Sequence, residues 1–225
     1  MASANDKMST GITWETFARA GDLQKRLLFT LGAMIVYRLG TFIPLPGINS
    51  VILEEIFTRN SGGILGMFNM FTGGALERMT LFALNIMPYI SASIIVQLAA
   101  SVIPSLMALK KEGESGQRKM TQYTRYLTVL ITIIQGYGFA VGLEALVGSA
   151  GTSAVINPGP WFRFTTVVSL LGGTMFIVWL GDQITARGVG NGSSMIITAG
   201  IIAGLPVGLA QTFELARAGE ISTFL

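Results

Sequence analysis

The sequence predicts an all-α integral membrane protein with five transmembrane helices and one short segment that enters the membrane without crossing it. Of the 225 residues, 51% are hydrophobic and only 12% are charged, and the mean hydropathy is +0.60. Soluble domains carry about 25% charged residues, so about half of the usual solvating surface is missing. Long uncharged runs then favour membrane spans over a soluble core, because a span needs about 20 mostly apolar residues.

The uncharged runs indicate where the spans lie. Four of them contain no charge, and a fifth contains only Arg38: Met79–Leu109, Tyr126–Leu143, Phe164–Gly181, Gly188–Phe213 and Leu27–Ile43. With turns and prolines as limits, we expect a polar tail over residues 1–26 and spans over about residues 27–43, 79–104, 126–143, 164–181 and 193–213.

Prolines and polar stretches separate these spans. Pro44 is expected to end the first span, because proline has no N–H with which to continue a helix. Pro88 is expected to kink the second span, and Pro104 is expected to mark its far end. The segments between the spans are expected to be polar excursions, loops or connectors: residues 48–60, 110–125, 147–161 and 182–192.

A shorter uncharged stretch lies between the first two spans. Ser61–Leu76 has a glycine pair near each end and a middle rich in Met and Phe. It is too short to cross the membrane, and its glycines supply hinges. We therefore expect residues 62–74 to form a re-entrant segment, with a short amphipathic helix on the membrane surface as the alternative.

Lysine and arginine are unevenly divided between the two sides of the predicted spans. Ten lie in the tail and in the second and fourth connectors, and four lie in the opposite segments. Because cytoplasmic segments carry the basic excess, we expect a cytoplasmic N-terminus. The cytoplasmic connectors then contain Lys110, Lys111, Arg118, Lys119 and Arg187.

The composition excludes several kinds of chemistry. The chain has no cysteine and no histidine, which removes zinc sites, thiol chemistry and histidine-based triads. Ionisable residues are almost absent from the spans, so a proton relay has no central carboxylate. We therefore expect no catalytic residue, no metal and no cofactor. The net charge of +3 is too small to indicate binding to DNA.

The second predicted span carries two neighbouring rows of side chains that differ in character. Ile86 and Ile90 are spaced i, i+4, while Met87, Ser91 and Ile94 follow a neighbouring row about 100° round the helix. Such a helix presents isoleucines to one environment and a mixed row to another. The simpler alternative is that the isoleucines face lipid or neighbouring helices.

Four stretches of the chain are long and distinctive: Met67–Leu76 (MFNMFTGGAL), Ile86–Gln97 (IMPYISASIIVQ), Lys110–Gly116 (KKEGESG) and Trp179–Gly192 (WLGDQITARGVGNG). They closely resemble the SecY family, whose members are central subunits of protein-conducting channels. The resemblance covers nearly the whole chain beyond residue 20. It implies that the chain is the first half of a ten-span channel, whose two pseudo-symmetric halves close like a clamshell.

The resemblance also implies roles for individual residues. Ile86, Ile90 and Ile197 match the family's hydrophobic constriction ring, and Ser193 stands where the family usually has another isoleucine. Asn85 departs from a position that favours glycine. Met87, Ser91 and Ile94 match the lateral gate. The plug, which blocks the resting channel, is matched by residues 62–74, including Gly63, Ile64, Met67, Phe68, Met70, Phe71 and Gly73.

The implied function is a channel subunit of the bacterial inner membrane that passes unfolded polypeptides and releases hydrophobic segments, such as signal sequences, into lipid. The implied partners are SecE, SecG, the SecA ATPase and the ribosome. An apolar constriction closes by dewetting and yields around any extended chain, so it needs no sequence-specific hydrogen bonds. The rival classes are a secondary transporter of a small solute, with Asn85, Gln97 and Gln135 as polar candidates, and a membrane scaffold.

The predicted orientation can be tested with single cysteines, because the chain has none of its own. We expect cysteines at Ser153 and Ser222 to react with a membrane-impermeant thiol reagent in intact cells. Cysteines at Ser115 and Gly190 should react only after permeabilisation. Labelling at Ser115 in intact cells would reverse the assigned orientation.

Overall fold

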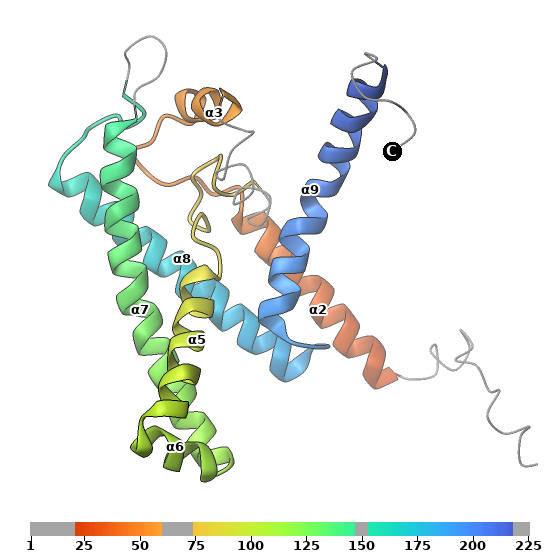
Figure 1. Cartoon of the computed structure of the whole chain (residues 1–225). Coiled ribbons are helices and arrows are strands. Elements are labelled where there is room, and N and C mark those ends of the chain that lie inside the picture. The colour runs from red at the N-terminus through yellow and green to blue at the C-terminus, as the bar shows by residue number, and fades with distance from the viewer. Residues whose placement is uncertain (1–20, 60–73, 147–152, 218–225) are drawn as a thin grey trace, which may run out of the picture.

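The computed structural model describes residues 21–59, 74–146 and 153–217, and these ranges are helical apart from turns and two isolated β-bridges. Residues of the described ranges form seven helices, drawn in Figure 1: α2 (Gly21–Gly40), α3 (Ser50–Arg59), α5 (Met87–Val102), α6 (Pro104–Lys111), α7 (Glu114–Ala145), α8 (Pro160–Arg187) and α9 (Gly192–Arg217). Residues 74–86, between α3 and α5, run as successive turns, and we call them the turn segment.

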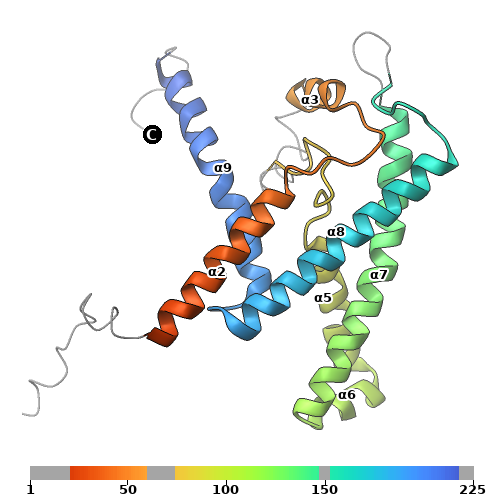
Figure 2. The same ribbon diagram turned by 180° about the vertical axis from the view of Figure 1, so that it is seen from behind.

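Helix α8 is the central element. It contacts α7 on one side and both α2 and α9 on the other, and α2 and α9 also contact each other. Helix α5 packs along α7 and is followed directly by α6. Views from the front and from behind agree that α7 and α9 stand on opposite sides of the molecule, with α3 and α6 at opposite ends (Figures 1 and 2).

Two helices, α7 and α8, are long and apolar enough to cross a membrane. The pair α5 and α6 makes a third span if its two parts are counted together, although the chain bends by 100° between them. The bend follows from Pro104, which begins α6 and restricts Ile103 to extended backbone at φ −88° and ψ 118°. Helix α5 therefore ends just before Pro104, while the bounds of the second span and the spans predicted around α2 and α9 stay predictions.

The beginning of the second span differs from the prediction. A helix from residue 79 is wrong, because α5 begins only at Met87 and the turn segment precedes it. Pro88 lies in the first turn of α5, where its missing N–H leaves no helical hydrogen bond unmade. Pro88 consequently starts this helix and does not kink it.

The charged connectors are more helical than expected. Residues 110–125 contain the end of α6 and the first turns of α7, and α8 continues through the predicted connector as far as Arg187. The predicted excursion over residues 48–60 contains α3. Loss of apolar character marks where a helix leaves the membrane, but it does not stop the helix, because Lys, Arg and Glu are good helix formers.

Glycines allow the turn segment to pass between α2 and α8. A Cβ atom on Gly40, at the end of α2, would overlap the ring of Phe82, and one on Gly173 of α8 would overlap the carbonyl oxygen of Leu81. Phe82 stacks on Tyr37 of α2, with ring centroids 6.1 Å apart, and on Phe176 of α8, at 5.9 Å. The turn segment is therefore wedged between two helices, without room for additional side-chain atoms.

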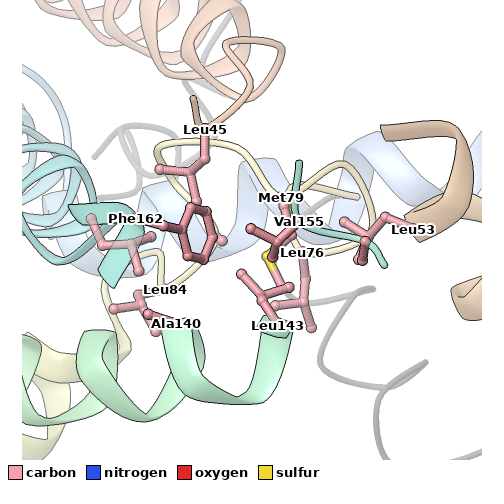
Figure 3. Close-up of a cluster of buried hydrophobic side chains, with 12 residues drawn as sticks. Leu45, Leu53, Leu76, Met79, Leu84, Ala140, Leu143, Val155 and Phe162 are labelled. Atoms are coloured by element: carbon pink, nitrogen blue, oxygen red, sulfur yellow. The ribbon is translucent and has the colours of Figure 1, made fainter. Parts of the chain in front are cut away.

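A second packing region involves residues of the turn segment on both sides of Leu81 and Phe82 (Figure 3). The backbone N–H of Leu45 donates to Met79 at 2.9 Å, and that of Asn49 donates to Ala154 at 2.9 Å, so three non-helical segments are joined. Beneath them lies a buried apolar cluster that connects these segments to α3, α7 and α8: Leu45, Leu53, Leu76, Met79, Ala83, Leu84, Ala140, Leu143, Ala154, Val155, Phe162 and Leu170.

Two ion pairs join α7 to α8, one near each end of their uncharged stretches. Arg125 bonds Asp182 at 2.7 Å, and Arg163 bonds Glu144 at 2.6 Å. On each helix the two charged residues are 19 positions apart, or about 28 Å at 1.5 Å per residue. This distance is close to the roughly 30 Å thickness of the bilayer hydrocarbon. The pairs are therefore spaced as boundary markers of a membrane-embedded hairpin.

The close packing of Phe82 of the turn segment against Gly40 leads to a prediction about stability. Gly40→Ala should lower the free energy of unfolding by about 1–3 kcal/mol, because the buried Phe82 ring cannot move away from the added methyl group. Gly32→Ala is the matched control on the same helix, since nothing lies within 4 Å of its added Cβ. Thermal unfolding of the detergent-purified protein, followed by tryptophan fluorescence, measures both. Equal unfolding midpoints for the two variants would contradict the wedge.

Candidate functional site

The first two predicted ring residues lie at the beginning of α5. Ile86 directly precedes the helix, and Ile90 follows one turn later, with its N–H donating to the Ile86 carbonyl at 3.1 Å. The side chain of Ile86 is only 1% exposed, whereas that of Ile90 is half-buried. Ile86 and Ile90 are thus one helical turn apart in the structure, as their i, i+4 spacing predicts, although the helix begins between them.

Ile86 belongs to a buried apolar group that we call the central cluster. It combines residues of α2, the turn segment, α8 and α9: Ala33, Tyr37, Phe82, Ile86, Ile177, Leu180, Ile184 and Ile196. Ile90 of α5 and Ile197 of α9 are partly buried and pack against it. Ile86 therefore lies inside the central cluster, and Ile90 and Ile197 each lie at its edge, while the ring itself stays a prediction.

Ser193, the fourth predicted ring residue, lies in the first turn of α9 and is half-buried. It is one turn before Ile197, so the two side chains project from neighbouring positions on the same face. This turn is held close to α8, because a Cβ on Gly192 would overlap the backbone of Gly181. The Ser193 hydroxyl is consequently carried by a rigidly placed turn next to the apolar surface.

Asn191 holds the start of α9, a role absent from the sequence-based prediction. Its side-chain oxygen accepts the N–H groups of Ser193 at 3.0 Å and Ser194 at 3.3 Å. This is the N-cap interaction that asparagine commonly makes. The signal was available in the sequence, since an asparagine directly before a long apolar run marks a helix start.

The three predicted lateral-gate residues occupy a different side of α5. Met87 is 39% exposed and Ile94 is 52% exposed, while Ser91 is half-buried. Other apolar side chains of α5 are exposed too: Ile95, Leu98 and Val102. In contrast to Ile86, this row is left uncovered by the described part of the chain.

The residues named for the predicted plug lie within residues 60–73, outside the described ranges: Gly63, Ile64, Met67, Phe68, Met70, Phe71 and Gly73. The described chain resumes at Gly74, whose φ of +82° is a conformation that favours glycine.

The basic connector residues are exposed and come from two junctions. Lys110 and Lys111 end α6, Arg118 and Lys119 lie in the first turns of α7, and Arg187 ends α8. Both junctions lie toward the same end of the molecule as the beginning of α2 (Figures 1 and 2). Arg118 pairs with Glu114 at 4.0 Å and Lys119 with Glu112 at 3.6 Å. Exposed pairs of this kind contribute little to stability, so these cations stay available to a partner.

A buried polar contact next to Ile86 was not predicted. The side-chain amide of Asn85 donates to the Tyr37 hydroxyl at 3.2 Å. Asn85 also has φ +49°, in the left-handed region that asparagine tolerates better than most residues. This conformation explains how asparagine occupies a position that favours glycine. Tyr37 carried no sequence signal, because its partner is 48 residues away.

The described ranges contain no group of three or more His, Cys, Asp or Glu residues that could hold a metal ion. The central cluster itself has no charged member. What this arrangement offers chemically is an apolar surface contributed by separate elements.

Comparisons with known proteins identify the family of the chain. The family model of SecY matches residues 80–225. The protein translocase subunit SecY of Escherichia coli is 57% identical over 201 residues, which cover 89% of this chain and 45% of that protein. The corresponding subunit of Buchnera aphidicola is 56% identical over 205 residues, covering 91% of this chain and 57% of that protein. The chain thus spans about half the length of the curated relatives it matches.

Solved structures share the fold. One described as "The structure of a protein conducting channel" superposes with a TM-score of 0.63 at 18% identity, covering 88% of this chain and 42% of that one. Sec61 in the canine ribosome-channel complex from the endoplasmic reticulum gives the same TM-score, identity and coverage. With a family match over residues 80–225 and a shared fold, the chain, a multi-pass membrane protein, belongs to the SecY family.

Proposed function

We propose that this chain forms one half of a protein-conducting channel in the bacterial inner membrane, which passes unfolded polypeptides across and releases hydrophobic segments into lipid. The observation that carries the proposal is that Ile86 belongs to the central cluster and that Ile90 and Ile197 both pack against it. Ile86 directly precedes α5, Ile90 lies in its first turn and Ile197 belongs to α9, so a movement between the two helices would change the width of an apolar constriction.

The proposed ring works by excluding water. Branched apolar side chains that face each other across a narrow passage leave water without hydrogen-bonding partners, so the passage dries and ions cannot follow. The same side chains give way to an extended polypeptide of any sequence, because they make no directional bonds with it. No covalent step is involved, and the energy for movement comes from a partner that drives the chain.

The exposed row on α5 supports a lateral path by which a hydrophobic segment leaves the proposed channel for lipid. Met87 and Ile94 are exposed and apolar, and they lie beside the ring on the same helix. A hydrophobic segment arriving at Ile90 could move onto this row and from there into lipid without entering water. We therefore assign Met87, Ser91 and Ile94 to the lateral gate of the proposed channel.

The remaining parts of the proposal rest on the charge pattern and the resemblance. The basic residues at the α6–α7 and α8–α9 junctions are placed on the cytoplasmic side, where SecA or a ribosome would deliver the substrate. SecE and SecG are the proposed membrane partners. Residues 62–74 form the proposed plug on the opposite side.

The surroundings of the polar residues disfavour a small-solute transporter. Asn85 is buried against Tyr37, whereas Gln97 and Gln135 are exposed. Gln97 donates to Ser93 on its own helix at 3.0 Å. These three side chains therefore have different environments, whereas a solute site needs them to converge.

The ring can be tested by single-channel recording of the full-length channel complex that carries these residues. Ile90→Ser should raise the resting ion leak by about tenfold, because burial of an isoleucine side chain is worth about 1.5–3 kcal/mol and its loss favours the wet state. Ser193→Ile should lower the leak by extending the apolar edge. Ile95→Ser, at an exposed position of α5, is the control.

Crowding is the competing effect for Ser193→Ile, since an added branched side chain can hold packed surfaces apart. If Ile90→Ser and Ser193→Ile both leave the leak at the parent's value, these residues do not line the gate.

The plug proposal has its own test. Deletion of residues 64–70 from the full-length channel should raise the resting ion leak while most translocation continues, because the ring still closes around a moving chain. A surface helix without a gating role would leave the conductance unchanged, and that result would remove the plug from the proposal.

A further inference from the structure

One side-chain hydrogen bond links α2 to the turn that leads into α5. The amide nitrogen of Asn85 donates to the hydroxyl of Tyr37 at 3.2 Å, and the two side chains are 3% and 1% exposed. A hydrogen bond removed from water is difficult to replace, because water cannot reach either group when the bond breaks. This contact is therefore a specific tie between two elements that are far apart in the sequence.

The backbone conformation of Asn85 couples its side-chain hydrogen bond to the beginning of α5. Its φ of +49° turns the chain sharply, and its own N–H donates to the Phe82 carbonyl at 2.8 Å. The next residue is Ile86, whose carbonyl accepts the Ile90 N–H. A change in the orientation of Asn85 would consequently be passed to Ile86 and the first turn of α5.

Tyr37, which accepts this hydrogen bond, is held in place by the packing around its ring. Its ring stacks on Phe82 with an interplanar angle of 3°, and it belongs to the central cluster together with Ile177 of α8 and Ile196 of α9. Helix α2 also contacts α8 and α9 directly. The hydroxyl of Tyr37 is thus held by the same framework that carries Ile197.

We propose that Tyr37 and Asn85 form a latch that positions Ile86 and Ile90 against Ile197 in the closed channel. This inference rests on the proposed function. The latch acts through the ring and does not itself touch the translocating chain, so both are positioning residues. When the first turn of α5 moves away from α9, the Asn85–Tyr37 hydrogen bond must stretch or break, and its loss opposes opening.

Two substitutions remove the hydrogen bond while preserving the shapes around it. Tyr37→Phe keeps the ring that stacks on Phe82 and loses the hydroxyl. Asn85→Gly keeps the left-handed backbone and loses the amide. Each should raise the resting open probability of the full-length channel about fivefold, equal to about 1 kcal/mol, the usual net value of one hydrogen bond. The double variant should leak no more than Asn85→Gly alone, because that substitution already removes the bond to Tyr37.

Thr30→Val is the matched control. Thr30 is buried and lies two turns before Tyr37 on the same face of α2. Its hydroxyl accepts the Val189 N–H at 3.0 Å, so this substitution removes a tie from α2 to the α8–α9 loop and not to α5. The control should have a lower thermal unfolding midpoint and an unchanged leak. If it raises the leak as much as Tyr37→Phe does, general loosening of α2 explains the result and the latch is wrong.

A second measurement reports the position of Ile86 directly. A single cysteine at Ile86 should react with a small thiol reagent several-fold faster in the Tyr37→Phe background than in the parent, because Ile86 is almost fully buried when the latch is intact. Unchanged labelling together with unchanged leak in both single variants, while Ile90→Ser raises the leak, would overturn the latch and leave the proposed function standing. Faster labelling with no change in leak would overturn the gating role of the latch. A leak unaffected by Ile90→Ser as well would reject the ring itself.

Discussion

The close approach of the turn segment to α2 and α8 is the constraint on which the rest of the structure depends. Gly40 and Gly173 leave space for Phe82 and the Leu81 carbonyl, and any side chain at these two positions would push the segment away. With the segment in place, Phe82 stacks between Tyr37 and Phe176. The position of α5, and therefore of its isoleucines, follows from this packing because the turn segment leads directly into the helix.

The α7–α8 hairpin provides a frame for this wedge. Its ion pairs, Arg125–Asp182 and Glu144–Arg163, join the two helices near both ends of their uncharged stretches. Along α7, the hydroxyls of Thr124, Thr128 and Thr132 each donate to the carbonyl four residues earlier. These threonines belong to a buried row that runs past the Arg125 pair: Gly116, Met120, Thr124, Thr128, Thr132, Gly136 and Ala140. Small residues with satisfied polar groups allow helices to pack closely in a bilayer, where burial against lipid supplies little driving force.

The functional surface contrasts with the polar contacts around it. The central cluster is apolar, so it can exclude water without recognising any particular sequence. Specific hydrogen bonds occur at its edge, between Asn85 and the cluster member Tyr37 and between Asn191 and the first turn of α9. Directional bonds position the elements, and non-directional contacts form the apolar surface. Such a division would suit the proposed channel, which has to close and yet accept many different chains.

Composition and run length were sufficient to identify a helical membrane protein, because the bilayer imposes long apolar segments and leaves helices as the way to satisfy the backbone. Family-like motifs drew attention to Ile86, Ile90 and Ile197, whose role in a ring stays a prediction. The break between α5 and α6 at Pro104 followed from local proline chemistry. The sequence pattern did not reveal that residues 74–86 are non-helical, since the same apolar residues suit a helix or a buried turn. The choice depends on Gly40, Gly173 and Tyr37, which lie far away in the chain and meet this segment only after folding. Long-range contacts of this kind leave no local period in the sequence, and the packing of α2 and α8 alone determines them.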